Sequence, residues 1–226
     1  RDSVASRGLG DVYKRQAARL KALTEMGHIT DKVELIILGG TWSDYPLAYQ
    51  IWFVRELFRA LNDGSKAQNN IAKRRTQYEH AGISSDVATL KKQVAPLQER
   101  IANQELSYNQ AFDLHYAISE AWGTVATWQS ATWEELETEH RTNETAHHRV
   151  VGLVIETRPE RITPHHAYTL RRLGCTKVQM GIQSLDEHIR KQNNRPTTNA
   201  QIQSAFETLR LFGFKTHIHA MVNLLG

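Results

Sequence analysis

The stretch Val33–Pro46, VELIILGGTWSDYP, decides the fold of this 226-residue chain. Its apolar run over residues 33–38 is interrupted only by Glu34 and ends in Gly39-Gly40-Thr41. Such a run is typical of a strand buried on both faces, as in a parallel sheet between helices. Parallel sheets bind ligands at the carboxyl ends of their strands, and glycines let the backbone approach a ligand closely. We therefore expect a binding turn directly after this strand.

The same order, an apolar run with a polar end, occurs three more times. The runs are RVVGLVIETRP at Arg149–Pro159, KVQMGIQS at Lys177–Ser184 and KTHIHAMVNLLG at Lys215–Gly226. Four strands separated by helical segments predict either a (β/α) barrel or an open doubly wound sheet. A dinucleotide-binding open sheet would carry G-x-G-x-x-G after its first strand, and that motif is absent here. Polar ends on all four strands favour a barrel with its site spread over several loops.

Cap residues mark the helices between these strands. Thr163 is a predicted N-cap, and Gly174 follows the end of the same predicted helix. The segments Ser184–Glu187 (SLDE) and Thr198–Gln201 (TNAQ) are typical capping boxes, and the helix after the second box is predicted to end before Gly213. Each polar strand end therefore leads into a helix start.

Four motifs, in this order, closely resemble the radical SAM domain of the Elongator protein 3 family. They are LGGTWSDYP, ETRPE, LGCTKVQMGIQS and HIHAMVNLLG, and the resemblance covers residues 17–62 and 132–226. The family joins a radical SAM barrel to an acetyltransferase domain and modifies the wobble uridine of tRNA. The resemblance implies an α/β fold, a partial (β/α) TIM-like radical SAM barrel with an inserted helical segment.

The resemblance also implies a reaction, the carboxymethylation of the wobble uridine (U34) at C5. In the family, a [4Fe-4S] cluster cleaves S-adenosylmethionine (SAM) reductively, and the 5′-deoxyadenosyl radical takes hydrogen from an acetyl group delivered by acetyl-CoA. The resulting carbon radical adds to C5 of the uridine. Two alternatives stay open: another radical SAM enzyme, similar to coproporphyrinogen dehydrogenase, and a non-catalytic RNA-binding barrel.

The single cysteine, Cys175, precedes the third predicted strand and so belongs at its amino end, opposite the expected cluster. We interpret it as a small buried residue, because one thiol cannot hold a cluster. The cluster cysteines and the acetyltransferase domain of the family are absent from this sequence. We therefore predict a fragment that is truncated at its C-terminus and inactive alone, with no metal ligands of its own.

The resemblance assigns cofactor binding to the strand ends. It implies that Gly39, Gly40 and Thr41 receive the amino group of the SAM methionine. Glu156 could accept a hydrogen bond from the SAM ammonium or ribose, and Arg158 could pair with the SAM carboxylate or an RNA phosphate. The alternative for these two residues is an ion pair with each other that steadies the rim.

Three further residues complete the predicted cofactor site. Gln183 and Ser184 end the third strand, and Asn223 follows the fourth; a glutamine amide can both donate to and accept from a ribose hydroxyl. His217 and His219 alternate on one face of the fourth strand, where we expect hydrogen-bonded residues of the barrel interior rather than metal ligands. The pairs His147-His148 and His165-His166 are expected at the surface. No catalytic residue can be assigned from the sequence.

Composition agrees with a cytoplasmic tRNA-modifying enzyme. Hydrophobic residues make up 40% and charged residues 23% of the chain, which is ordinary for a globular protein. No apolar run is long enough to span a membrane, and one cysteine provides no disulfide framework. The net charge of +4 is compatible with tRNA as a partner. The resemblance adds SAM and acetyl-CoA as partners of the full-length protein, and it leaves a homodimer or Elongator-like subunits open.

We divide the chain into four parts. Residues 1–16, RDSVASRGLGDVYKRQ, share nothing with the family and resemble translated adaptor sequence, so we expect a non-native or disordered segment. The alternative is a flexible arm that contacts RNA. Residues 17–64 form the first part of the barrel, residues 65–131 a helical insertion, and residues 132–226 the continuation of the barrel.

The predicted insertion carries a short heptad stripe, formed by Val87, Leu90, Val94, Leu97 and Ile101. Pro96 lies inside the stripe, which favours two helices over a single straight one. A solvated helical lid with a packing stripe is the favoured interpretation. The basic runs Lys73-Arg74-Arg75 and Lys91-Lys92 keep open an arm that contacts RNA or another subunit.

Overall fold

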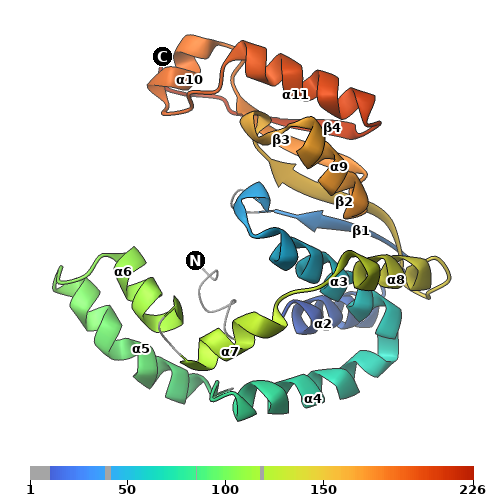
Figure 1. The fold of residues 1–226 in the computed structure, drawn as a ribbon, viewed down its shortest axis with the longest axis vertical. Coiled ribbons are helices and arrows are strands. Elements are labelled where there is room, and N and C mark those ends of the chain that lie inside the picture. Colours follow the sequence, from blue (N-terminus) through green and yellow to red (C-terminus); the bar gives the residue numbers. More distant parts are fainter. Residues whose placement is uncertain (1–10, 39–41, 85, 118–119) are drawn as a thin grey trace.

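A computed structural model describes residues 11–38, 42–84, 86–117 and 120–226 (Figure 1). Its sheet has four parallel strands in the order β1-β2-β3-β4. The strands are β1 (Lys32–Ile37), β2 (Arg149–Thr157), β3 (Lys177–Gln183) and β4 (Lys215–Ala220). Strands adjacent in the sheet are also consecutive in the chain, and helices connect them, so the predicted alternation of strands and helices is confirmed.

The helices around the sheet are α2 (Val12–Glu25), α3 (Leu47–Asp63), α8 (Trp133–Asn143), α9 (Pro164–Arg172), α10 (Glu187–Gln192) and α11 (Asn199–Leu211). Three-residue 3-10 turns are η1 (Trp42–Asp44), η2 (Gly64–Lys66) and η4 (Pro159–Arg161). The connection from α3 to α8 is much longer than the others. It contains α4 (Ala67–His80), α5 (Val87–Ala102), α6 (Tyr108–Phe112), a π-helical turn η3 (Asp113–Ala117) and α7 (Glu120–Trp128).

The sheet is covered by helices on one face only. Side chains of α3, α9 and α11 pack with alternate residues of the strands, such as Leu35, Ile155 and Met180, in one hydrophobic core. The residues in between face the other way, and Ile36 is 50% exposed. The prediction that residues 33–38 are buried on both faces is therefore wrong. The strand is apolar because its second face is the inner wall of a barrel, which is open in this chain.

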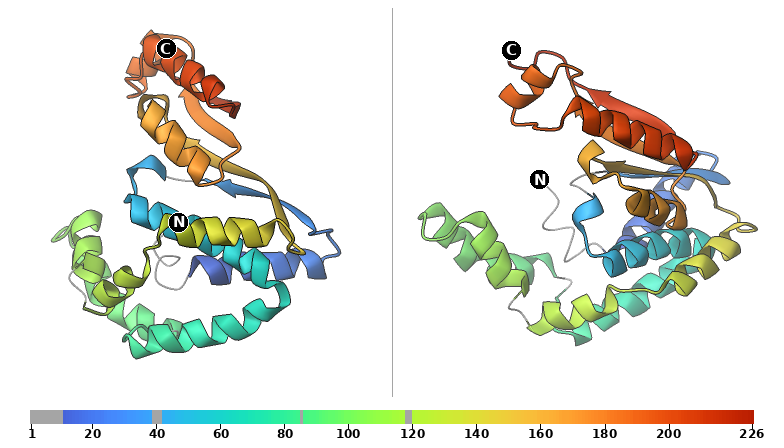
Figure 2. Two further views of the ribbon diagram at one scale, coloured as in Figure 1. Left: turned by 45° about the vertical axis from the view of Figure 1, so that its right-hand side comes forward. Right: turned by 45° about the horizontal axis from the view of Figure 1, so that its top comes forward.

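This one-sided cover distinguishes the two predicted architectures. An open doubly wound sheet carries helices on both faces, whereas a barrel carries them only on its outside. Figures 1 and 2 show α3, α9 and α11 along the same side of the sheet. The prediction of a partial (β/α) barrel is thus confirmed.

Most cap residues act as predicted. Thr163 and Thr198 are N-caps, the latter in a capping box with Gln201, and Gly174 and Gly213 adopt positive φ just after α9 and α11. The box predicted at Ser184–Glu187 is wrong, because Asp186 is the N-cap and its carboxylate accepts from the amides of His188 and Ile189. An aspartate adjacent to the first turn displaces the more distant serine.

Helices α4 to α7 form an arc that extends away from the sheet (Figure 1). Where two helices were predicted around Pro96, α5 is a single helix that runs through it. A proline removes one backbone hydrogen bond, and good helix formers on both sides keep the helix intact. No side chain of α5 is fully buried, although Leu90, Val94, Leu97 and Ile101 of the heptad stripe are half-buried. The boundaries proposed for the insertion stay a prediction.

The chain enters the fold before residue 17. Helix α2 begins at Val12, and the Tyr13 side chain is fully buried and donates a hydrogen bond to Asp63 with an O–O distance of 2.6 Å. The last residues of the segment that we expected to be non-native or disordered are therefore helical, while residues 1–10 lie outside the described ranges. None of the helices in those ranges is long and apolar enough to cross a membrane.

Candidate cofactor and substrate site at the strand ends

The sheet register brings polar side chains into one row on its open face. Glu156 of β2 is the register partner of Gln179 in β3, and Gln179 is the partner of His217 in β4. Register partners in a parallel sheet project from the same face. Glu156 stands next to the last residue of β2, where an α/β barrel holds its ligands, whereas Gln179 and His217 are the third residues of β3 and β4 because the strands are staggered.

Glu156 is linked across the sheet to β4. Its carboxylate Oε1 lies 3.5 Å from Nδ1 of His219, a pair that carries opposite charges when the imidazole is protonated. The rings of His217 and His219 are 5.3 Å apart between centroids, so these two histidines share one face as predicted. The pair gives the open face a carboxylate and a titratable base side by side.

Gln179 was not identified from the sequence. Its side-chain oxygen Oε1 is buried and has no hydrogen-bond partner among the described residues. Buried acceptors of this kind are rare and call for a donor, such as a water or a ligand. The one feature of the sequence that could have indicated a role for Gln179 is its position four residues before Gln183, on the same face of the strand. An isolated glutamine inside a strand is a weak indication of a binding site.

Two predicted site residues have unusual backbone geometry. Gln183 has φ +69° and Asn223 has φ +58°, both in the left-handed region that non-glycine residues seldom adopt. Each such residue costs roughly 1–3 kcal/mol, and such strain concentrates at binding sites. The Gln183 side chain folds back over Gly181, where an added Cβ would lie 2.8 Å from its amide nitrogen. The absence of a side chain at Gly181 thus leaves room for the Gln183 amide at the end of β3.

Ser184 is held by a buried arginine that the sequence did not reveal. Arg190 is 1% exposed, and it donates to the carbonyl oxygens of Ser184 and Thr197 at 2.6 and 2.8 Å and to Oδ1 of Asn199 at 2.7 Å. These bonds tie the end of β3 to the start of α11. Arg190 therefore fixes the loop in which Gln183 and Ser184 stand.

Arg158 lies at the rim, where its guanidinium is 4.0 Å from Glu160 and its side chain is 49% exposed. It is thus accessible to an anionic partner. The turn Gly39-Gly40-Thr41 lies outside the described residues. The first described element after it is η1, which begins at Trp42.

A chain of hydrogen bonds connects η1 to the end of β2 and to α9. The Ser43 hydroxyl lies 2.6 Å from Oγ1 of Thr157 and 2.8 Å from Nε2 of His166. Burial lowers the pKa of His166, so its imidazole is neutral at pH 7. His166, which was expected at the surface, is half-buried. His148, also expected at the surface, is buried with Nδ1 2.7 Å from the carbonyl oxygen of Thr30.

Cys175 is placed as predicted, in the core at the amino end of β3. It is 1% exposed, and its thiol donates to the carbonyl oxygen of Lys177 at 3.2 Å. Burial raises the pKa of this thiol to about 12, which disfavours the thiolate that an iron–sulfur cluster needs. Among the described residues, no group of three His, Cys, Asp or Glu side chains is arranged to bind a metal. The described residues therefore do not fit a [4Fe-4S] cluster.

The comparison with protein families finds one match. Residues 123–226 match the model of the radical SAM superfamily. This part of the chain contains β2, β3 and β4, so the match agrees with the parallel sheet and its polar strand ends.

Known proteins sharpen this assignment. The chain is similar to a tRNA uridine(34) acetyltransferase of Dehalococcoides mccartyi, with 30% identity over 95% of this chain and 32% of that protein. It is 24% identical to Elongator complex protein 3 of Schizosaccharomyces pombe over 97% of this chain and 28% of that protein. A solved structure of Methanocaldococcus infernus Elp3 aligns with a TM-score of 0.63 and 26% identity, over 96% of this chain and 35% of that one.

The resemblance to the Elongator protein 3 family is thereby confirmed. The chain spans about a third of the length of the curated relatives it matches.

Proposed function

We propose that this chain is the radical SAM segment of an enzyme that carboxymethylates the wobble uridine of tRNA at C5, with SAM and acetyl-CoA as co-substrates. The proposal is supported by relatives named tRNA uridine(34) acetyltransferase and Elongator complex protein 3, which align over nearly the whole chain. The full-length protein is proposed to act in the cytoplasm, to bind tRNA and acetyl-CoA with regions outside this chain as well, and to hold its cluster outside it.

The open face of the sheet carries the proposal. Its residues fit SAM, because the orphaned acceptor of Gln179 needs a donor and the Glu156 carboxylate can accept from an ammonium or a hydroxyl group. Gln183, Ser184 and Asn223 are proposed to line the same site from the neighbouring strand ends. Bound SAM supplies the radical chemistry, whereas the protein orients the ligand and excludes water.

The proposal is tested by SAM binding in the anaerobically reconstituted full-length protein. Glu156→Gln is expected to lower SAM affinity by tenfold or more, about 1.4 kcal/mol, because a charged acceptor becomes a neutral one. Arg149→Gln, at the exposed amino end of the same strand, is the matched control and should leave the affinity unchanged. Equal affinities in wild type and Glu156→Gln would remove Glu156 from the site.

The reaction itself is tested by the formation of 5′-deoxyadenosine. The wild-type protein should release it from SAM faster when a substrate tRNA is present. Gly40→Val should abolish this release without changing iron content, if the glycine turn receives the methionine of SAM. If tRNA does not change the rate at which 5′-deoxyadenosine is released, the result would favour another radical SAM enzyme over the proposed function.

A further inference from the structure

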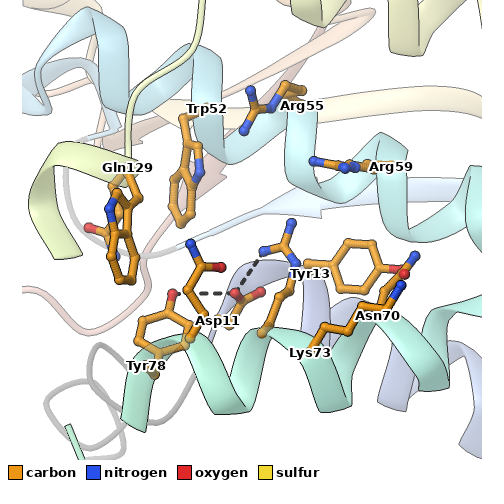
Figure 3. A pocket seen from close by; sticks show the side chains of 12 residues that line it. Asp11, Tyr13, Trp52, Arg55, Arg59, Asn70, Lys73, Tyr78 and Gln129 are labelled. Carbon is orange, nitrogen blue, oxygen red and sulfur yellow. Dashed lines mark hydrogen bonds and ion pairs between the residues drawn. The ribbon is translucent and has the colours of Figure 1, made fainter. Parts of the chain in front are cut away.

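A second site lies on the helices, apart from the strand ends. A cavity of about 320 Å³ is lined by residues of α2, α3, α4 and α7, together with Asp11 and Gln129 just outside the helices, and none of its lining residues comes from a strand (Figure 3). Its volume lies in the range of small-molecule sites. The polar row on the sheet contributes nothing to it, so it calls for its own explanation.

One end of the cavity is aromatic. Trp52, Tyr78 and Trp128 line it, and the Tyr78 and Trp128 rings meet edge to face with their centroids 6.1 Å apart. Trp52 is only 4% exposed and therefore forms a fixed wall. In Figure 3, Trp52 and Tyr78 stand on the side of Gln129. Aromatic rings of this kind can stack against any of the nucleobases, because every base has a flat π-face.

The other end is cationic. Figure 3 shows Arg59, Asn70 and Lys73 at the side opposite Gln129. The Arg59 guanidinium lies 3.8 Å from Glu56 and 4.0 Å from Glu139, distances beyond a hydrogen bond, and its side chain is 46% exposed. Lys73 is exposed, and no ion pair of Lys73 is found within the described ranges. Both cations thus have donors available for an anion.

A buried carboxylate organises the arginines that complete the lining. Glu56 is fully buried and accepts from Arg74 of α4, while the Arg55 guanidinium lies 3.1 Å from it. Arg74 also bonds to Asp11, and these two acids raise its pKa despite its burial. The neutralised pairs form a rigid floor. Among the cations that line the cavity, Lys73 has no ion pair within the described ranges, and Arg59 has only the two long ion pairs to Glu56 and Glu139.

We propose that this cavity binds one nucleoside phosphate unit, with the base against Trp128 and Tyr78 and the phosphate on Arg59 and Lys73. The unit belongs either to an RNA strand or to a free nucleotide. Assignment of this unit to an RNA strand rests on the proposed function. Recognition of a base and a phosphate, which an RNA strand and a free nucleotide have in common, does not. Asp11 and Tyr13 also line the cavity, although they belong to the segment that the sequence predicts to be non-native. The proposed contacts with the base and the phosphate therefore come only from Tyr78, Trp128, Arg59 and Lys73, which lie outside that segment.

The experiment measures fluorescence anisotropy of a labelled single-stranded oligoribonucleotide with the full-length protein. Trp128→Ala should weaken binding about tenfold or more, because base stacking on an aromatic ring is removed. Trp122→Ala is the matched control on the same helix, since Trp122 contacts Tyr116 and does not line the cavity. The double variant Arg59→Ser/Lys73→Ser should flatten the log–log salt dependence by about 0.7 for each phosphate that the protein no longer neutralises, and Lys91→Ser should not.

A second arm uses uridine and adenosine monophosphates as competitors and direct ligands. Binding of the oligonucleotide that depends on Trp128, with no such binding of monophosphates, assigns the site to an RNA strand. Monophosphate binding that depends on Trp128 assigns it to a free nucleotide. Unchanged binding of both probes in Trp128→Ala, or equal weakening by Trp128→Ala and Trp122→Ala, overturns the proposal.

A third arm removes residues 1–16, with the fold checked by circular dichroism. The effects of Trp128→Ala and Arg59→Ser/Lys73→Ser should persist. Their disappearance would show that residues 1–16 create the cavity, and it would overturn the proposal. These assays need neither SAM nor a cluster, so their failure is distinguishable from failure of the proposed function.

Discussion

The sheet and the helical arc that leaves it are built in opposite ways. In the sheet, buried apolar side chains such as Val154, Leu153 and Met180 are fully inaccessible and fix the strand ends to which the polar site residues are attached. In the arc, α5 has no buried residue and α4 buries only Ala67. The arc is joined to α2 and α3 by a small apolar cluster of Tyr13, Ala17, Ala60 and Ala67 and by charged contacts, above all Glu56 with Arg74. Extensive packing holds the sheet, whereas the arc combines a small apolar contact with ion pairs.

The largest effect should come from the core. Met180→Ala is expected to lower the free energy of unfolding by roughly 2–5 kcal/mol, because it opens a cavity under the sheet. Leu90→Ala, at a half-buried position of α5, is the counterpart in the arc and should lower the free energy of unfolding by only about 1 kcal/mol or less. Urea unfolding of the full-length protein measures both. Similar decreases for the two variants would show that α5 packs against a region outside this chain.

This contrast also explains which features the sequence could predict. Alternation of apolar residues and caps such as Thr163 act locally, so strands and most helices were found. The sequence did not reveal that helices cover only one face of the sheet, because the inner wall of a barrel is as apolar as a face covered by helices. Arg190 and Gln179 were missed since their roles depend on partners from distant segments. Ser43 and His166 are likewise joined only by the folded chain.

The next effect concerns the junction between the two regions. Glu56→Gln should destabilise the protein by about 1.5–3 kcal/mol, because it removes the buried charge that Arg55 and Arg74 share while Glu135 and Asp11 remain as their other partners. The destabilisation should be local, so cleavage within residues 65–131 by limited proteolysis should speed up far more than global unfolding. Glu79→Gln, whose partner Arg75 is exposed on the same helix, is the control. Unchanged proteolysis would mean that the arc is held by something other than Glu56.

A smaller effect is expected at the strained end of β3. Gln183→Gly should be more stable than Gln183→Ala by about 1 kcal/mol, because only glycine adopts φ near +69° without steric cost. Both variants remove the side-chain amide, so both should show the same reduction in SAM affinity if that amide contacts the ligand. Thermal unfolding and SAM titration separate the two effects. Equal stabilities would show that the loop relaxes and that the strain is not imposed by the fold.

The smallest effect is a pH dependence at the link between η1 and α9. Burial lowers the pKa of His166, with the charges of His165 and Arg161 acting in the same direction, and the Asp44 carboxylate lies 2.6 Å from Arg161. Because the unfolded chain binds the proton more readily, the stability that neutral His166 contributes is complete above its ordinary pKa of about 6.5 and is lost as pH falls through the lower folded value. Protonation also makes Nε2 of His166 a donor, so that the Ser43 hydroxyl oxygen can then only accept from it. His166→Gln should therefore reduce the difference in urea midpoint between pH 7.5 and pH 5.5, whereas His28→Gln, at an exposed histidine, should leave it as in wild type. If the His166→Gln protein kept the full difference, other buried histidines such as His140, whose pKa is also lowered by burial, would have to account for it.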